Sequence, residues 1–249
     1  MITLKTEKEL QHMRKACAVV AEVLRVMKSS VVPGITTLEL DRIAEKLIEE
    51  MGAISAFKGY RGYRHATCLS VNHEIVHGIP TDRVLLEGDI IGVDVGARVA
   101  GFYGDAAATF PVGRVDKKVE KLLRVTKQAL NLAIAQARCG NHLGDISHAI
   151  EQHAVRFGYS VVRELFGHGV GAELHEDPLV PNFGRPGQGP KLQAGMVLAI
   201  EPMLNMGGYA IETLSDGWTV VTKDRSLSAH FEHTVLIAEQ GPEILTLLN

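Results

Sequence analysis

Apolar residues recur at intervals of three and four positions in four segments of the chain, and each segment predicts an amphipathic helix. Thr6 with Glu9, and Thr36 with Glu39, match the capping box that opens a helix, so two helices are expected to begin there. The first of them should end near Ser29, shortly before a proline and a glycine.

Two further helices are expected in the second half of the chain. Asp116 and Asp145 are their predicted N-caps, and Gly158 is the predicted stop of the last helix. His153 falls on the apolar face of that helix, where a packed core histidine is favoured over a metal ligand.

Most of the remaining chain predicts β structure. Residues Ile90–Ala97 and Gly101–Val112 predict a hairpin that turns at Val99–Ala100. Prolines and glycines make residues 178–190 a predicted surface loop. Because hairpins follow the strands more often than crossover helices do, the pattern favours an α+β fold. Further strands are expected at Met196–Leu204, Trp218–Thr222 and His230–Ala238.

One pattern occurs twice, about 107 residues apart. Residues 88–94 and 195–201 both run from a glycine through an apolar stretch to a carboxylate, which is Asp94 in the first copy and Glu201 in the second. The glycines that bracket the second and fourth predicted helices repeat with an offset of 106. We therefore expect two half-domains that close on each other.

The acids at the ends of these two repeats indicate a bound cation. A carboxylate that ends an apolar stretch is costly to bury unless a cation neutralises it. If the hairpin turns at 99–100, Asp94 lies directly opposite Asp105, with Cβ atoms about 5 Å apart. Two carboxylates at that distance repel each other, and one stays protonated unless a cation holds both.

Three more residues complete the candidate site. Glu201 ends the second repeat, Glu232 lies in a predicted strand, and His168 stands between two glycines. Four carboxylates and one neutral imidazole carry a charge of −4, which two divalent ions balance. Two metals about 3.5–4 Å apart can hold a hydroxide and polarise a carbonyl, so the expected chemistry is metal-assisted hydrolysis. The alternative is that these acids are ordinary strand-face residues or partners in structural ion pairs.

Two familiar motifs occur without the structural context they need. Residues 73–77 spell the zinc-protease motif H-E-x-x-H, which works only on a helix, and Gly78 and Pro80 end any helix there. Residues 167–172 spell G-x-G-x-x-A, but a loop is predicted where nucleotide binding requires a helix. We expect neither a zinc-protease helix nor a nucleotide site.

Composition narrows the classes of protein further. The 249 residues are 46% hydrophobic and 22% charged, which is ordinary for a soluble globular protein. A net charge of −3 gives no case for nucleic acid or an anionic membrane, and no apolar stretch is long enough to span a bilayer. Cys17, Cys68 and Cys139 are too few for a disulfide framework. Because the N-terminus is charged and helix-patterned instead of signal-like, the expected compartment is the cytoplasm.

Several motifs are spread along the chain in the order of one known family. They are Asp94 and Asp105 eleven residues apart, residues 167–171 with 175–178, residues 200–203, residues 232–234, and the flanking stretches 216–220 and 223–229. Together they resemble the type I methionine aminopeptidases over effectively the whole chain. The resemblance implies one catalytic domain over residues 1–249 with the pita-bread fold. In that fold two pseudo-symmetric halves, here roughly 1–112 and 113–249, surround a curved antiparallel sheet with helices on the outer face.

The resemblance also implies how the metal ligands divide between two divalent ions. Asp94 would chelate one ion, and Asp105 and Glu232 would bridge both. His168 and Glu201 would complete the other ion. Cobalt, manganese, iron, zinc and nickel are all compatible with such ligands, so the physiological metal stays open.

The implied reaction is removal of the N-terminal methionine from nascent proteins and peptides whose second residue is small. A hydroxide held between the metals would attack the first peptide carbonyl. Glu201 would shuttle the proton to the leaving amine. His77 and His175 would contact the nitrogen and the carbonyl oxygen of the scissile peptide.

Methionine is flexible and carries a polarisable sulfur, so an aromatic and soft pocket suits it. Phe57 stands where bacterial relatives are expected to have cysteine, and Leu174 where they are expected to have phenylalanine. Gly96 stands where a hydroxyl residue is common. The family's pocket positions are matched by Tyr60, Tyr63, Cys68 and Trp218.

The partner implied by the resemblance is a peptide or nascent chain that begins with methionine, with transient ribosome contact and a monomeric state. An X-Pro aminopeptidase or dipeptidase would use the same ligands, but those enzymes usually carry a large N-terminal domain, for which Asp94 comes too early. A metal-free binding protein on the same scaffold normally lacks some ligands, and all five are present here.

Overall fold

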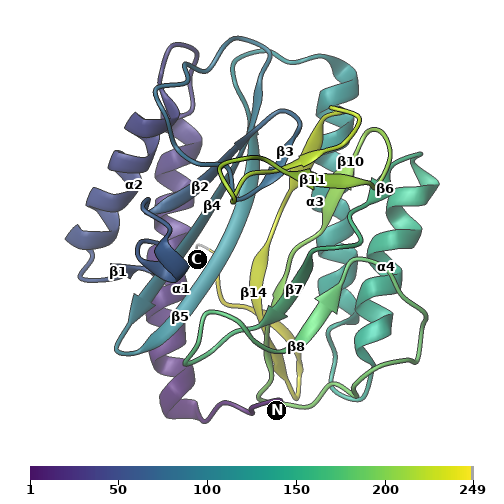
Figure 1. Ribbon diagram of the computed structural model, residues 1–249. Helices are drawn as coiled ribbons and strands as arrows, with labels where there is room; N and C mark the ends of the chain where they lie inside the picture. Colours follow the sequence, from purple (N-terminus) through teal and green to yellow (C-terminus); the bar gives the residue numbers. More distant parts are fainter. Residues whose placement is uncertain (248–249) are drawn as a thin grey trace.

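The computed structural model describes residues 1–247, and within them four α-helices flank a set of antiparallel strands (Figure 1). Two helices lie beside the first half of the strands and two beside the second half. The helices are α1 (Glu7–Ser30), α2 (Thr37–Glu50), α3 (Lys117–Gln136) and α4 (Leu143–Arg156), with a short 3₁₀ turn, η1, at Tyr60–Gly62.

The capping signals located three of the four helix starts. The capping boxes of Thr6 with Glu9 and of Thr36 with Glu39 are both formed, and Asp116 is the N-cap of α3. The prediction for α4 was wrong, because its N-cap is His142 and not Asp145. The Asp145 carboxylate instead reaches back to accept a hydrogen bond from the His142 N–H at 2.7 Å, which is the role of the third residue in a capping box.

The strands form several small antiparallel sheets. One contains β1, β4 and β2 with β5 beside β4; the others have the orders β13-β10-β6, β11-β12-β3 and β15-β14-β9-β7-β8. The strands are β1 (Ile54–Ser55), β2 (Thr67–Val71), β3 (Glu74–Val76), β4 (Ile90–Val99), β5 (Phe102–Pro111), β6 (Ser160–Val161), β7 (Phe166–Gly169), β8 (Glu176–Pro181), β9 (Val197–Ile200), β10 (Met203–Asn205), β11 (Ile211–Thr213), β12 (Val220–Thr222), β13 (Ser228–His230), β14 (His233–Ala238) and β15 (Gly241–Ile244).

The hairpin of β4 and β5 turns one residue later than predicted. Its two-residue loop is Ala100–Gly101, both with positive φ, which is the backbone that matches the twist of the flanking strands. The later turn moves the register, so Asp94 lies opposite Ala107 and Asp105 lies opposite Gly96. The two aspartates are therefore diagonal neighbours on the same face, and the prediction that they lie directly opposite each other was wrong.

Two predicted strands are each interrupted at a candidate ligand. The segment 196–204 divides into β9 and β10 at Glu201–Pro202, and the segment 230–238 divides into β13 and β14 at Phe231–Glu232. Proline lacks the N–H that a continuous ladder needs, and the two pieces pair with different strands. As a result, Glu201 and Glu232 both lie outside the regular strands, and both side chains line the same cavity.

Two other predicted segments are shorter than expected. The strand predicted at 218–222 is regular only from Val220 to Thr222. The loop predicted at 178–190 begins only after Pro181, because β8 includes Pro178 and Pro181. Strand β8 is the edge of its sheet, where proline is tolerated because that side needs no ladder hydrogen bond.

The sequence repeat has a structural counterpart. Gly88 and Gly195 both have positive φ in the turns before β4 and β9. The chain before each turn forms an isolated bridge to the N-cap of a helix, Thr36 to Val84 in the first half and His142 to Lys191 in the second. Each half also has its own principal hydrophobic core, one around α1 and α2 and the other around α3 and α4.

The halves meet along a seam between β5 and the chain around Glu232. The Glu232 N–H donates to the Ala107 carbonyl at 2.8 Å. Two residues to either side, the Thr109 hydroxyl bonds the backbone of His230 at 2.7 and 2.9 Å, and the Thr234 hydroxyl bonds the backbone of Asp105 at 2.7 and 3.1 Å. These hydrogen bonds fix the alignment of β5 with residues 230–234, and so the position of Asp105 relative to Glu232.

Within residues 1–247, none of the helices combines the length and the apolar character that a membrane crossing requires.

Candidate metal centre and adjoining pocket

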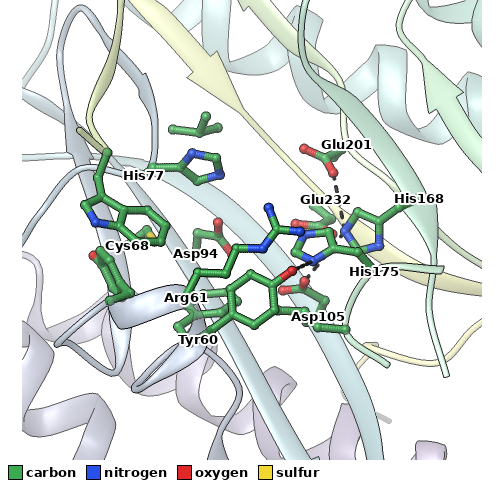
Figure 2. A pocket seen from close by; sticks show the side chains of 15 residues that line it. Tyr60, Arg61, Cys68, His77, Asp94, Asp105, His168, His175, Glu201 and Glu232 are labelled. Atoms are coloured by element: carbon green, nitrogen blue, oxygen red, sulfur yellow. Dashed lines mark hydrogen bonds and ion pairs between the residues drawn. The ribbon is translucent and has the colours of Figure 1, made fainter. Parts of the chain in front are cut away.

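All five predicted metal ligands line one cavity of about 340 Å³ (Figure 2). Asp94 and Asp105 rise from the β4–β5 hairpin, and His168 comes from β7. Glu201 and Glu232 come from the two strand interruptions of the second half. Side chains more than 130 positions apart in sequence thus converge at the seam between the halves.

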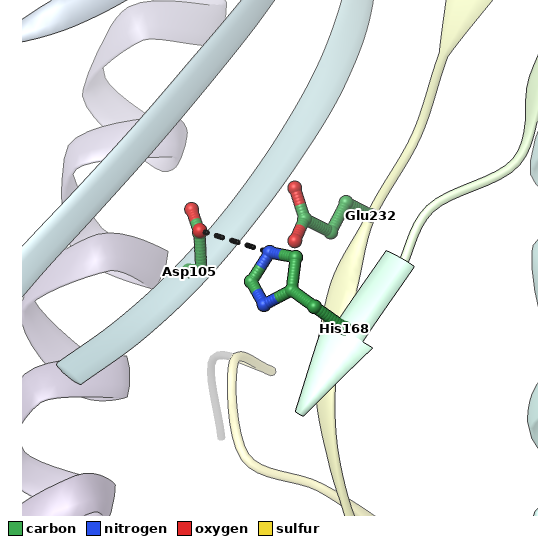
Figure 3. A group of neighbouring side chains, drawn as sticks. All are labelled: Asp105, His168 and Glu232. Carbon is green, nitrogen blue, oxygen red and sulfur yellow. Dashed lines mark ion pairs between the residues drawn. The ribbon is translucent and has the colours of Figure 1, made fainter. Parts of the chain in front are cut away.

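Asp105, His168 and Glu232 form the most compact part of this group (Figure 3). One potential ligand atom from each lies within 4.8 Å of the others, and all three residues are about 96% buried. His168 Nε2 is 3.9 Å from Asp105 Oδ2 and 3.7 Å from Glu201 Oε1. This spacing is wide enough for a cation between the ligand atoms and too wide for direct hydrogen bonds.

The ring of His168 is held in the tautomer that a metal ligand needs. Its Nδ1 lies 2.9 Å from the carbonyl oxygen of Gly169, so Nδ1 carries the hydrogen and donates to that carbonyl. The lone pair is then on Nε2, which faces the carboxylates. Burial lowers the pKa of His168 to about 3, so the imidazole is neutral at physiological pH.

Within residues 1–247, no lysine or arginine forms an ion pair with any of the four carboxyl groups. Burial raises the pKa of Asp94 to about 7. Burial, and then the charges of Asp94 and Glu201, raise the pKa of Asp105 well above its ordinary value. The pKa values of Glu201 and Glu232 are raised for the same reasons, first burial and then the neighbouring carboxylates. Such groups either hold protons or bind a metal.

Unpartnered oxygen atoms show that the residues fit a metal. Among the described residues, Asp94 Oδ1, Asp105 Oδ1 and Glu232 Oε1 are buried and have no hydrogen-bond partner. Buried polar atoms are almost always paired, so three orphaned carboxylate oxygens around one cavity indicate cation ligands. Together with the neutral imidazole they are the oxygen and nitrogen donors that divalent transition metals accept.

His77 and His175, predicted from the resemblance, line the same cavity as the carboxylates. Burial, and then the charge of His175, lower the pKa of His77 to about 4. The pKa of His175 is lowered by burial and then by Arg61. The Tyr60 hydroxyl lies 2.9 Å from His175 Nδ1 and orients that ring toward His168.

The remaining pocket residues form an apolar extension of the cavity. Tyr63 is buried, donates its hydroxyl hydrogen to the Thr67 carbonyl at 2.9 Å, and meets the Trp218 ring edge-on with 5.0 Å between the ring centroids. Cys68 on β2 is buried, and its thiol stays protonated because burial, and then Asp94, raise its pKa. An aromatic pocket with one polarisable sulfur therefore opens directly from the carboxylate cluster.

Two of the residues that depart from the expected family pattern lie against each other. A Cβ atom on Gly96 would come within 2.7 Å of a Phe57 ring carbon and within 2.7 Å of the Ala56 Cβ. The phenyl ring thus fills the space that a hydroxyl residue at position 96 would need. Leu174, the third departure, packs in the same cluster as Phe57. Phe57 and Leu174 therefore belong to the pocket wall.

Neither of the two rejected motifs has the structure that it needs. Glu74–Val76 is strand β3, so His73 and His77 do not share a helix face. Residues 166–169 form β7, and the chain then bends without opening a helix. His153 is half-buried on α4 and packs its ring against Phe157.

Two residues beside the centre were not predicted from the sequence. His230 Nε2 lies 3.7 Å from Glu201 Oε2 and 3.8 Å from Glu232 Oε2. In an extended segment, residues two apart point to the same face. The position of His230 two residues before Glu232 was therefore a sequence signal that it lies beside the site. Arg61 lines the cavity mouth with its guanidinium over the Tyr60 ring. Its backbone φ of +48° places it there, and no sequence pattern indicates that conformation.

The model of one family, described as metallopeptidase family M24, matches residues 11–239. The chain belongs to metallopeptidase family M24. Membership makes it a metal-dependent hydrolase that acts on peptides, which confirms the predicted class of enzyme and the use of divalent metal.

Similar proteins match over their full length. A methionine aminopeptidase of Clostridium perfringens is 54% identical over 248 residues, which cover 100% of each chain. Methionine aminopeptidase 1 of Bacillus subtilis is 52% identical, with 99% of each chain covered. The crystal structure of a methionine aminopeptidase from Thermotoga maritima has a TM-score of 0.98 and 48% identity, and covers 100% of both chains. These matches confirm the pita-bread fold.

Solved structures at lower identity share the fold alone. A prolidase from Pyrococcus furiosus has a TM-score of 0.81 and 24% identity, and this chain spans only 66% of that protein.

Proposed function

We propose that this chain removes N-terminal methionine from peptides and nascent proteins whose second residue is small. The observation that carries the proposal is one cavity in which four carboxylates and His168 adjoin an aromatic, sulfur-containing pocket. The full-length similarity to methionine aminopeptidases supports the same substrate. We further propose that residues 1–249 act as a single catalytic domain built from two halves, 1–112 and 113–249.

We assign the five ligands to two divalent ions. Asp94 would hold one ion, His168 and Glu201 would hold the other, and Asp105 and Glu232 would be shared between them. Two divalent ions balance the −4 charge of the ligand set, whereas a single ion leaves half of it uncompensated. When bound, the ions supply Lewis acidity that polarises a carbonyl oxygen and acidifies a water molecule. Cobalt, manganese, iron, zinc and nickel all accept these donors.

The protein's own residues carry out the proton transfers and hold the substrate. Glu201 lies at the edge of the cluster, where its carboxylate takes a proton from the attacking water and passes it to the leaving amine. His77 and His175 are neutral imidazoles that hydrogen-bond the nitrogen and the carbonyl oxygen of the scissile peptide.

The pocket selects the first side chain by shape and polarisability. Tyr60, Tyr63, Cys68 and Trp218 form walls that a flexible thioether fills without leaving a polar group unpaired. A charged side chain would lose its hydration there and gain no partner from the apolar wall. This desolvation gives the expected preference for methionine over lysine or glutamate.

We also propose a compartment, an oligomeric state and binding partners for the protein. We infer that it is a cytoplasmic monomer that binds nascent chains and contacts the ribosome only transiently. Cys17, Cys68 and Cys139 are free thiols, which fits a reducing compartment.

A panel of short peptides with metal analysis tests the function. Met-Ala-Ser should lose its methionine in a reaction that a chelator stops, while Met-Leu-Ser and Lys-Ala-Ser should turn over at least about 100-fold more slowly. Turnover of Xaa-Pro peptides without turnover of Met-Ala-Ser would assign the chain to the X-Pro enzymes instead. Absence of both activities and of bound metal would support a metal-free binding role.

A further inference from the structure

His230 is the last residue of β13, and its imidazole is 97% buried beside the carboxylate cluster. Its Nε2 faces Glu201 Oε2 at 3.7 Å and Glu232 Oε2 at 3.8 Å. This nitrogen has no hydrogen-bond partner within residues 1–247. A buried imidazole nitrogen without a partner is uncommon, so its position between two proposed ligands calls for an explanation.

The backbone of His230 is fixed from two sides. Its N–H donates to Thr109 Oγ1 at 2.9 Å and its carbonyl accepts from the same hydroxyl at 2.7 Å, which ties it to β5. On the other side His230 pairs with Met203, two residues after Glu201. The ring is therefore held close to the two strand interruptions that contain Glu201 and Glu232.

Glu201 has a different neighbour for each of its oxygens. Oε1 lies 3.7 Å from His168 Nε2, whereas Oε2 faces His230. With metal bound the two glutamates would be ionised and could only accept hydrogen bonds, so the His230 nitrogen that faces them would carry the hydrogen. A shift of about 0.5 Å in the flexible Glu201 side chain brings Oε2 to hydrogen-bond distance.

We propose that His230 is a positioning residue that donates its Nε2 hydrogen to Glu201. The donation anchors Oε2 and leaves Oε1 free for the metal and for proton transfer. This role rests on the proposed function of the site. Outer hydrogen bonds of this kind orient metal ligands, and their loss costs about 10–100-fold in metal affinity or activity.

Two substitutions separate hydrogen-bond donation from packing. His230→Gln keeps an N–H donor at a similar reach, whereas His230→Leu fills the space without a donor. The control is His153→Leu, because His153 Nε2 is also buried without a partner among the described residues but lies on α4, outside the cavity. The measurements are Mn²⁺ affinity by calorimetry, the unfolding midpoint of the metal-free protein, and kcat and KM on Met-Ala-Ser.

We expect His230→Leu to lower Mn²⁺ affinity and kcat by about 10–100-fold with KM changed less than about threefold. The metal-free midpoint should stay the same or rise, because the variant removes an unpaired buried polar group. His230→Gln should recover most of the affinity and kcat, and His153→Leu should change neither.

Wild-type Mn²⁺ affinity in His230→Leu would overturn the proposal, as would equal losses in the Gln and Leu variants. A large fall of the metal-free midpoint in His230→Leu would show a structural role instead. If the wild-type protein binds Mn²⁺ in a His230-dependent way but does not cleave Met-Ala-Ser, the proposed function fails and the positioning role stands.

Discussion

Among single residues, Asp105 joins the two halves at the site, since its carboxylate faces His168 and its backbone is bonded by Thr234 from the other half. Asp105→Asn keeps the shape and removes the charge. We expect kcat on Met-Ala-Ser to fall by more than the roughly 100-fold typical of outer-sphere changes, because a ligand itself is lost. Circular dichroism and the metal-free unfolding midpoint should show that the fold survives.

The matched control for this substitution is Asp82→Asn, which removes the same charge from an exposed position outside the cavity. It should leave kcat within about twofold of wild type, as surface substitutions usually do. Wild-type turnover in Asp105→Asn would rule out the bridging role.

The raised pKa values of the carboxyl groups predict a pH dependence of stability. Unfolded histidines, with a pKa near 6.5, are still partly charged at pH 7, and this contribution is the same in the wild type and in Asp94→Asn. The folded pKa of Asp94 is about 7 and its unfolded value is near 4, so the native state binds more protons and its stability falls as pH rises through 7. The unfolding midpoint of the metal-free protein should therefore drop between pH 7 and 8.

Two comparisons check this assignment. Asp94→Asn should show a smaller drop over the same pH interval, because its amide does not titrate. The metal-loaded protein should also show a smaller drop, since the metal replaces the protons. An equal drop in the wild type and in Asp94→Asn would contradict the assigned cause.

At the scale of elements, Asp41 on α2 connects a helix to the pocket wall. Its buried Oδ1 accepts from the Ala66 and Thr67 N–H groups at 3.0 and 2.9 Å and from the Thr67 hydroxyl at 2.7 Å. Tyr63 donates to the Thr67 carbonyl, so the pocket depends on the same segment. Asp41→Ala should cost about 2–4 kcal/mol of unfolding free energy in denaturant titrations, because buried donors lose their acceptor.

Asp41→Asn is the comparison, since its amide oxygen can still accept some of these hydrogen bonds. It should lose less stability, and KM for Met-Ala-Ser should rise more in Asp41→Ala than in Asp41→Asn. A loss below about 1 kcal/mol in the alanine variant would show that α2 does not support this wall.

Helix starts were largely predicted from the sequence, whereas strand register and strand interruptions were not. The starts of α1 and α2 were predicted correctly because a capping box is formed by residues three apart. The hairpin register was wrong because it depends on which residue of the turn adopts positive φ, and that choice moved the partner of Asp94 by two positions. The interruption at Glu201 was missed although Pro202 was a local signal for it, and the strands that pair with its two pieces are distant in sequence.

At the scale of the whole molecule, the repeat predicted two halves and a site between them, since both copies end in a carboxylate. The division of the strands into several sheets was not predictable, because it arises where the halves meet. Orphaned buried oxygens are likewise a property of the assembled site. They explain why the strongest evidence for a metal comes from the structure, although the candidate ligands were chosen from the sequence.

Because proposed ligands from both halves line one cavity, bound metal should join the halves and stabilise the entire fold. A metal at about 100 times its Kd adds about 2.7 kcal/mol, and in a chain of this size that raises the unfolding midpoint by about 5–10 °C. Differential scanning calorimetry with Mn²⁺ and with chelator measures this shift. Asp105→Asn should show little shift, because removing one shared ligand weakens the connection between both halves. Equal midpoints for the loaded and chelated wild-type protein would mean that the carboxylate cluster does not bind metal with useful affinity, and the metallopeptidase mechanism would then lack its cofactor.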